Sequence, residues 1–445
     1  MKRTFFGTDG IRGPYGGPVV NESFFSRLGA AAALWLAKRH RTGAKVYIGR
    51  DTRASGASLA DALGTGVMAA GAQPLYVGVV PTPAISRAVS HGSAGLGAVI
   101  TASHNPASDN GVKFFGPDGS KLTDAEEAAL EKLIIGTVVP PIAIELAAES
   151  VLESYVEAAT RILSPGALRG WRVALDTANG ATCATSPAVF AALGAQVLGL
   201  GDKPDGLNIN RAVGSEHPEG LARLVMEGGA SFGVAHDGDG DRCILCDEKG
   251  GVLDGDEVLA ILATHALRKG TLASRTLVVT VQSNLGLDRA VRQAGGKVVR
   301  TDVGDRYVAE RMRVEGATLG GESSGHILSF DLSPTGDGLS AALKVAGVMA
   351  ETGRPLSELR KVMQKFPQRT AALEVHHKKP IESLSGLQSA IRGLEASLGS
   401  EGRVLVRYSG TEPKLRFLVE GPTAAAVADG IGRLVYAARA ELDAH

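Results

Sequence analysis

Three aspartates alternate with glycines in the run Asp237-Gly238-Asp239-Gly240-Asp241. Three carboxylates this close repel one another unless a cation or raised pKa values compensate their charge. Glycine lets the backbone curl so that the side chains can converge, and oxygen ligands of this kind suit Mg²⁺, Mn²⁺ or Ca²⁺. The run therefore predicts a divalent-cation site, with a solvated acidic turn as the alternative.

Two readings of the neighbouring residues are set aside. An EF-hand is excluded because Arg242 stands where the calcium loop needs glycine, and because the flanking segments are typical of strands rather than helices. Cys243 and Cys246 form a C-x-x-C pair, but Ile244 and Leu245 between them indicate a strand. We expect both thiols to pack in a core.

A second polar loop, TASHNP at residues 101–106, follows the apolar segment 97–100. The carboxyl end of a strand is where α/β proteins place ligands, although Ser, Asn and Pro also form ordinary turns. The loop offers a hydroxyl nucleophile, Ser103, beside His104. Adjacent side chains usually diverge, so we expect a group other than His104 to activate Ser103. Lys113, on a short strand soon after, could act as acid or base if desolvated, with an ordinary surface lysine as the alternative.

A third loop, GGESSGH at residues 320–326, contains G-x-S-x-G around Ser323. A nucleophile elbow needs a helix after the serine, whereas the following HILSF is typical of a strand. The loop's carboxylate, hydroxyls and imidazole could bind the hydroxyl or amino groups of a sugar. A polar hairpin loop is the alternative.

The fourth segment, RYSGTEPKLR at residues 407–416, places a glycine and two hydroxyls between two arginines and a lysine. Turn amides, hydroxyls and guanidinium groups together form a phosphate cradle. The Walker A spacing is absent, and an ordinary hairpin with surface charges is the alternative.

The elements that must position these loops form a repeat of strand, Gly-containing turn, helix and strand. It begins at KVYIG (45–49), WRVALD (171–176) and TLVVTV (276–281), and each copy predicts a parallel βαβ unit. We expect an α/β protein of three similar domains with mixed sheets and a smaller C-terminal α+β domain, around one central cleft. The predicted domains are 1–148, 149–250, 251–367 and 368–445.

Composition limits the class of protein. The 445 residues carry 47 Lys and Arg against 47 Asp and Glu, which argues against a sequence-independent nucleic-acid binder. Hydrophobic residues make up 44%, which excludes wholesale disorder, and three cysteines do not suggest a disulfide framework. The sequence shows no apolar signal segment and no membrane span, so we expect a soluble cytoplasmic protein with no membrane partner.

Taken together, a serine, a cation site, a hydroxyl-binding loop and a phosphate cradle suit phosphoryl transfer to or from a phosphosugar. In order and over nearly the whole chain, TASHNP, DGDGDR, GESSGH and RYSGTEPKLR resemble the loops of the α-D-phosphohexomutases. The resemblance implies that Ser103 becomes a phosphoserine whose phosphate, with Asp237, Asp239 and Asp241, holds one Mg²⁺.

The same resemblance implies further roles. Lys113 is similar to the family's acid/base, His104 and Arg12 would support the transfer, and Arg242 would contact the phosphoserine. The expected substrate-binding residues also include those of the sugar-binding and phosphate-binding loops: Glu322, Ser324, His326, Arg407, Ser409, Gly410, Thr411 and Arg416.

The segments FGTDGIRG, DNGVKFF, VGDRYV and TGDG most resemble a bacterial subgroup of this family. That subgroup interconverts glucosamine 6-phosphate and glucosamine 1-phosphate through a hexosamine 1,6-bisphosphate, on the route to UDP-N-acetylglucosamine and peptidoglycan. Ser323 occupies a variable position and does not separate this substrate from glucose or mannose phosphates. A serine hydrolase using Ser323 and a non-enzymatic cation-binding module are the remaining alternatives. A homodimer is possible.

Overall fold

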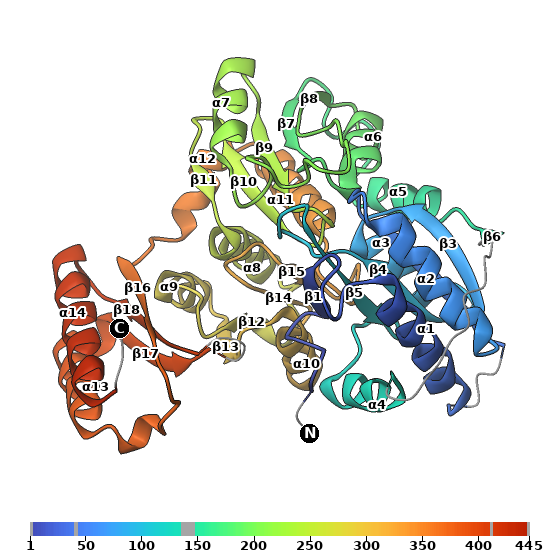
Figure 1. Cartoon of the computed structure of the whole chain (residues 1–445). Helices are drawn as coiled ribbons and strands as arrows, with labels where there is room; N and C mark the ends of the chain where they lie inside the picture. The colour runs from blue at the N-terminus through green and yellow to red at the C-terminus, as the bar shows by residue number, and fades with distance from the viewer. Residues whose placement is uncertain (1–2, 40–42, 135–146, 410–412, 443–445) are drawn as a thin grey trace. The chain divides into compact units, whose positions relative to one another are not determined.

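The computed structural model describes residues 3–39, 43–134, 147–409 and 413–442 (Figure 1). The chain separates into two compact units, one made of residues 1–281 and 295–362, the other of residues 282–294 and 363–445. The first unit holds three mixed sheets and the second holds one antiparallel sheet. Within the described ranges, no helix combines the length and the apolar character needed to cross a membrane.

The first sheet of the larger unit has six strands in the order β1-β5-β4-β2-β3-β6. Strand β2 pairs in parallel with β3 and β4, whereas β5 pairs antiparallel with β1 and β4. Helices α1 and α2 can pack closely because Gly66 has no side chain; a Cβ there would lie 1.8 Å from the carbonyl oxygen of Ser26. The elements are β1 (Ile11–Pro14), α1 (Glu22–Ala37), β2 (Lys45–Arg50), α2 (Gly56–Ala69), β3 (Gln73–Val79), α3 (Thr82–His91), β4 (Ala94–Ile100), β5 (Asp109–Phe115), α4 (Asp124–Ile134) and β6 (Ala147–Ala148).

The second sheet has the order β11-β10-β9-β7-β8. Its parallel pair β7–β8 is the predicted βαβ unit, and the antiparallel pair β9–β10 carries the aspartate loop between its strands. Strand β11 pairs with β10, so this sheet continues past residue 250 and the turn there joins two strands of one sheet. The elements are α5 (Leu152–Thr160), β7 (Arg172–Asp176), α6 (Ser186–Ala192), β8 (Gln196–Leu200), α7 (Glu219–Gly228), β9 (Phe232–His236), β10 (Cys243–Asp247) and β11 (Val252–Leu253).

Both cysteines of the C-x-x-C pair are fully buried on β10, as expected for core residues. Burial raises the pKa of Cys243 and of Cys246 to about 12, so neither is a thiolate at neutral pH.

The third sheet has the order β13-β12-β14-β15, with β12 parallel to both neighbours and β14–β15 antiparallel. A strand follows the GGESSGH loop, so the nucleophile elbow is absent, as the sequence predicts. The elements are α8 (Gly255–Lys269), β12 (Thr276–Thr280), β13 (Lys297–Thr301), α10 (Asp305–Glu315), β14 (Leu319–Gly321), β15 (Ile327–Ser329), α11 (Gly338–Thr352) and α12 (Leu356–Leu359).

The smaller unit is an α+β structure with strand order β16-β18-β17, all antiparallel. Helices α13 and α14 pack on this sheet around a core that includes Leu387, Phe417 and Leu434. The sequence predicts β17, β18 and α14, whereas β16 and α13 were not predicted. The elements are α9 (Leu285–Gln293), β16 (Gln368–Glu374), α13 (Ser385–Leu398), β17 (Arg403–Tyr408), β18 (Lys414–Glu420) and α14 (Ala424–Glu441).

The predicted fold class, three α/β regions with mixed sheets and a smaller α+β region, is therefore confirmed. The limits of the four domains and the single central cleft stay predictions.

Candidate active site

Ser103 lies in the loop after β4, with its side chain fully buried. Its backbone has φ 52°, a left-handed conformation that is uncommon for serine, and its amide donates to Thr101 Oγ1 at 2.8 Å. The Ser103 hydroxyl donates to Asp237 Oδ2 at 2.5 Å. The serine loop and the aspartate loop, 134 residues apart in the sequence, therefore meet in the larger unit.

The serine loop is held by Arg53, which no motif in the sequence singled out. Arg53 is fully buried and pairs with Asp51, with 2.9 Å between Nε and Oδ2. Its guanidinium donates to four carbonyl oxygens of the serine loop, those of Ser103, Asn105, Pro106 and Asp109. Asn210 Nδ2 adds bonds to the Ser103 and Asn105 carbonyls at 2.8 and 3.0 Å. A charged run directly after a predicted strand was the available signal.

Asp237, Asp239 and Asp241 are fully buried, and one oxygen of each lies within 4.8 Å of the others. Burial, together with the charges of Asp239 and Asp241, raises the pKa of Asp237 to about 7. Among the described residues, Asp239 Oδ1 has no hydrogen-bond partner although it is buried. A buried acceptor left unpaired is costly, so this donor set fits a bound cation with oxygen ligands.

Lys113 on β5 points at the same cluster. Its Nζ lies 2.9 Å from Asp239 Oδ2, 2.7 Å from Asp241 Oδ2 and 3.1 Å from Asp9 Oδ2, and the side chain is 2% exposed. Burial alone would lower the pKa of Lys113, but Asp239, Asp241 and Asp9 raise it well above its usual value. Lys113 is therefore a cation at neutral pH.

His104 differs from the expectation that its ring would diverge from Ser103. His104 Nδ1 lies 3.4 Å from Ser103 Oγ, because the left-handed turn at Ser103 brings the two side chains to one side. Burial and the charges of Arg242 and Arg12 lower the pKa of His104 to about 3, so the ring is neutral. The closer acceptor of the Ser103 hydroxyl is Asp237.

Arg12 and Arg242 are placed beside this cluster. Arg12 on β1 donates to Asp9, and Arg242 directly follows the aspartate loop. Burial would lower the pKa of Arg242, but Asp237 and Asp241 raise it, so Arg242 stays charged.

The GGESSGH hairpin contacts the aspartate loop through His326. His326 Nδ1 lies 3.1 Å from Glu322 Oε2, and Nε2 lies 2.8 Å from Asp241 Oδ1. Burial would lower the pKa of His326, but Asp241 outweighs it and the pKa rises to about 10. The charged ring therefore links the aspartate loop to Glu322, which also accepts from the Gly304 amide at 2.9 Å. Ser324 lies half-buried at the turn of the hairpin.

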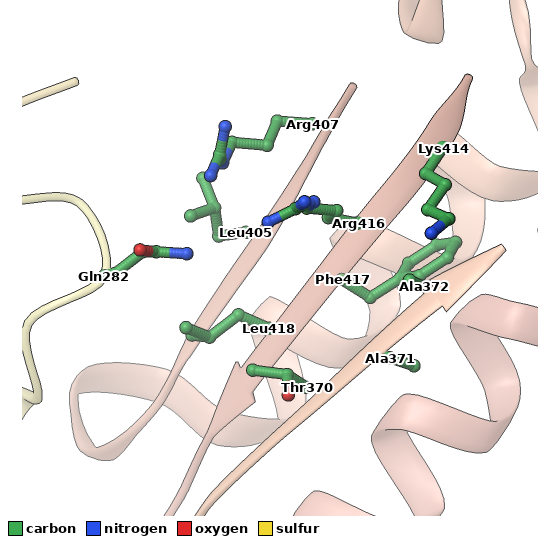
Figure 2. Close-up of a pocket in the computed structure, with 10 residues that line it drawn as sticks. All are labelled: Gln282, Thr370, Ala371, Ala372, Leu405, Arg407, Lys414, Arg416, Phe417 and Leu418. Atoms are coloured by element: carbon green, nitrogen blue, oxygen red, sulfur yellow. The ribbon is translucent and has the colours of Figure 1, made fainter. Parts of the chain in front are cut away.

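In the smaller unit, Arg407 and Arg416 are opposite each other on β17 and β18. They line a pocket of about 390 Å³ together with Lys414 and Gln282, and Figure 2 shows both guanidinium groups on the same side of the sheet. Such a density of cations and donors can bind an anion.

The loop beside this pocket carries further predicted residues. The Ser409 amide donates to the Lys414 carbonyl at 2.8 Å. Lys378 Nζ, which the sequence analysis missed, donates to the Ser409 carbonyl at 2.6 Å, and the basic run 376–379 was its signal. Gly410 and Thr411 lie outside the described residues.

Four family models together match most of the chain. They describe phosphoglucomutase/phosphomannomutase alpha/beta/alpha domain I (residues 3–137), domain II (153–251), domain III (254–366) and the C-terminal domain (353–435).

Individual proteins similar to this chain belong to the same family. A phosphoglucosamine mutase of Anaeromyxobacter dehalogenans is 44% identical, with 97% of this chain and 98% of that protein covered. One of Alkalilimnicola ehrlichii is also 44% identical, with both chains covered completely. A crystal structure of a phosphoglucomutase/phosphomannomutase family protein from Burkholderia thailandensis superimposes with a TM-score of 0.83 at 25% identity, covering 98% of this chain and 97% of that one. The fold also matches an Aspergillus fumigatus N-acetylphosphoglucosamine mutase, with a TM-score of 0.70 at 19% identity over 99% and 96% of the two chains.

These matches extend over all four predicted regions. In the structure, the buried serine loop contacts the buried aspartate loop. The chain therefore belongs to the phosphoglucomutase/phosphomannomutase family, in its phosphoglucosamine mutase branch, and is an isomerase.

Proposed function

We propose that this isomerase interconverts glucosamine 6-phosphate and glucosamine 1-phosphate, with Ser103 carrying the phosphoryl group. The observation that supports the role of Ser103 best is its buried hydroxyl, 2.5 Å from the first carboxylate of a three-aspartate cluster. The substrate rests on relatives named phosphoglucosamine mutase that are 44% identical over nearly the full chain.

One Mg²⁺ would be held by Asp237, Asp239 and Asp241 together with an oxygen of the Ser103 phosphate. This donor set is made of hard oxygen ligands, which Mg²⁺ prefers. When bound, the ion neutralises charge on the phosphoryl group as it moves.

The residues around Ser103 supply the proton transfers. As the bond between phosphorus and Ser103 Oγ breaks and the bond to the sugar oxygen forms, Oγ needs a proton and the sugar hydroxyl loses one. Lys113, which resembles the family's acid/base, would carry this proton from the sugar hydroxyl to Oγ; its Nζ lies 2.9 Å from Asp239 Oδ2 and 2.7 Å from Asp241 Oδ2. His104, whose Nδ1 lies 3.4 Å from Ser103 Oγ, would support the transfer by hydrogen bonding, and Arg12 and Arg242 would add positive charge.

The product of this step is a hexosamine 1,6-bisphosphate, which returns its other phosphoryl group to Ser103 by the reverse chemistry. Glu322, Ser324 and His326 would bind the sugar. The loop that binds the phosphate that does not react would use Arg407, Ser409, Gly410, Thr411 and Arg416. We further propose a cytoplasmic enzyme and leave the homodimer as a prediction.

The substrate is tested with purified protein, Mg²⁺ and a trace of hexosamine bisphosphate, supplied separately with glucosamine, glucose and mannose 6-phosphates. We expect the highest kcat/KM for glucosamine 6-phosphate. A higher value for glucose or mannose phosphate would make the enzyme a phosphoglucomutase or phosphomannomutase of the same family, which is the second candidate.

The phosphoserine is tested by intact mass. We expect an addition of about 80 Da that disappears in Ser103→Ala, together with the activity. An addition that persists in that variant, or full activity without it, would refute the role of Ser103. A fluorophosphonate probe provides the control, since a serine hydrolase would be labelled at Ser323.

A further inference from the structure

Lys121 is a second lysine beside the aspartate loop, and the proposed function does not use it. Its side chain is 6% exposed, and its Nζ lies 2.6 Å from Asp9 Oδ1 and 2.7 Å from Asp305 Oδ2. The nearest oxygen of Asp241 is farther away, at 4.0 Å. Two carboxylates that are distant in the sequence, Asp9 and Asp305, therefore hold the ammonium of Lys121 in place.

Asp9 connects Lys121 to two of the proposed site residues. Its Oδ2 lies 3.1 Å from Lys113 Nζ and accepts a hydrogen bond from Arg12, while its Oδ1 faces Lys121. Each oxygen of this carboxylate thus has its own cations, so the orientation of Asp9 depends on Lys121. The other two carboxylates on Lys113 belong to the proposed cation site, which leaves Asp9 as the partner outside it.

Asp305 connects Lys121 to the sugar-binding hairpin. It is the first residue of α10, and the preceding Gly304 donates its amide to Glu322 Oε1 at 2.9 Å. A continuous series of contacts therefore runs from Glu322 through the turn at 304–305 and Lys121 to Asp9 and Lys113.

We propose that Lys121 and Asp305 are positioning residues for the phosphoryl transfer, which fix Asp9 and through it the ammonium of Lys113. The inference rests on the proposed function of the site, because it assigns the two residues to that reaction. A long lysine side chain in a polar cluster has several rotamers, and a misplacement of about 1 Å at a reacting group can cost about 100-fold in rate. The same contacts fix the position of Glu322 relative to Lys113.

The competing explanation is that Lys121 and Asp305 only join α10 to the first sheet. Another ion pair already does this: Arg306 Nη2 lies 2.6 Å from Glu127 Oε1 on α4. That pair joins the same two regions. Arg306 donates to Asp124 and Glu127 rather than to Asp9, so it is a matched control.

The test compares kcat and KM of the full chain with Lys121→Met and Asp305→Asn, with rates referred to the fraction of protein that carries phosphate on Ser103. We expect kcat to fall about 10- to 100-fold in both variants with KM little changed. Arg306→Met and Lys344→Met should keep kcat close to that of the unchanged protein. Lys344 pairs with Asp331 at 2.7 Å outside the site. If Lys121→Met fails to fold, the nearly isosteric Asp305→Asn is compared with the controls instead.

A double-mutant cycle with Lys113→Met separates positioning from support. If Lys121 acts through Lys113, adding Lys121→Met to Lys113→Met lowers the residual kcat little further. An equal loss in both backgrounds, or an equal loss in Arg306→Met, overturns the inference. If the unchanged protein converts another hexose phosphate instead, the proposed substrate fails, and the same comparison on that sugar still decides the role of Lys121.

Discussion

Arg53 gives a prediction whose size follows from its contacts. Replacing it by methionine keeps most of the side-chain volume but removes the ion pair with Asp51 and the bonds to the serine loop. Asp51 keeps Thr101 Oγ1 as a donor at 2.7 Å but loses its buried counter-charge. Removing one partner of a buried ion pair costs about 3–5 kcal/mol.

The lower end of that range applies because most of the carbonyls keep another donor. Asn210 still donates to the carbonyls of Ser103 and Asn105, and the Asp109 amide still donates to that of Pro106. We therefore expect a loss of about 3 kcal/mol, which is about a 100-fold larger opening equilibrium for the serine loop.

The assay is hydrogen exchange followed by mass spectrometry on peptides that cover residues 101–111. The protection of these amides should fall about 100-fold in Arg53→Met, since local opening governs their exchange. Arg50→Met is the matched control, because Arg50 bonds Tyr76 and the Asp51 carbonyl. Unchanged protection in Arg53→Met, or an equal fall in Arg50→Met, would refute the reasoning. Arg53→Met should also lose phosphorylation of Ser103.

Three more predictions follow from the site. The raised pKa of Asp237, about 7, means that the folded state binds an extra proton between about pH 4 and 7. The free energy of unfolding of the magnesium-free protein should therefore fall as pH rises through this window. Adding Mg²⁺ should restore this stability and release about one proton at pH 6. Calorimetry in two buffers that shows no proton release would contradict this prediction. A Cβ on Gly238 would lie 2.5 Å from the Ser103 carbonyl, so Gly238→Ala should destroy activity, whereas Gly393→Ala, with no atom within 4 Å, should leave activity intact. With the pKa of His104 lowered to about 3, its protonation should not limit kcat between pH 5 and 8, and an acid limb near pH 6.5 that vanishes in His104→Gln would show otherwise.

Local patterns in the sequence were sufficient for the repeated elements. In each βαβ unit an apolar strand, a glycine-containing turn and a helix follow one another within about 30 residues, so periodicity and turn chemistry identify them. The hairpin around the aspartate loop was predicted for the same reason, since apolar segments flank it on both sides. Strand β16 was missed because its polar, mostly exposed residues do not show the apolar pattern of a strand.

The charge states and the supports of the site were decided only by the tertiary structure. The sequence by itself determined which side chains are available. These are a serine after one predicted strand, a lysine on the strand that follows it, and three aspartates that alternate with glycines. It could not show that Lys113 is held charged by Asp239 and Asp241, more than 120 residues away, or that Arg53 binds the Ser103 loop. The physical reason is that pKa values and loop geometry depend on burial and on neighbours through space, and only folding brings these groups together.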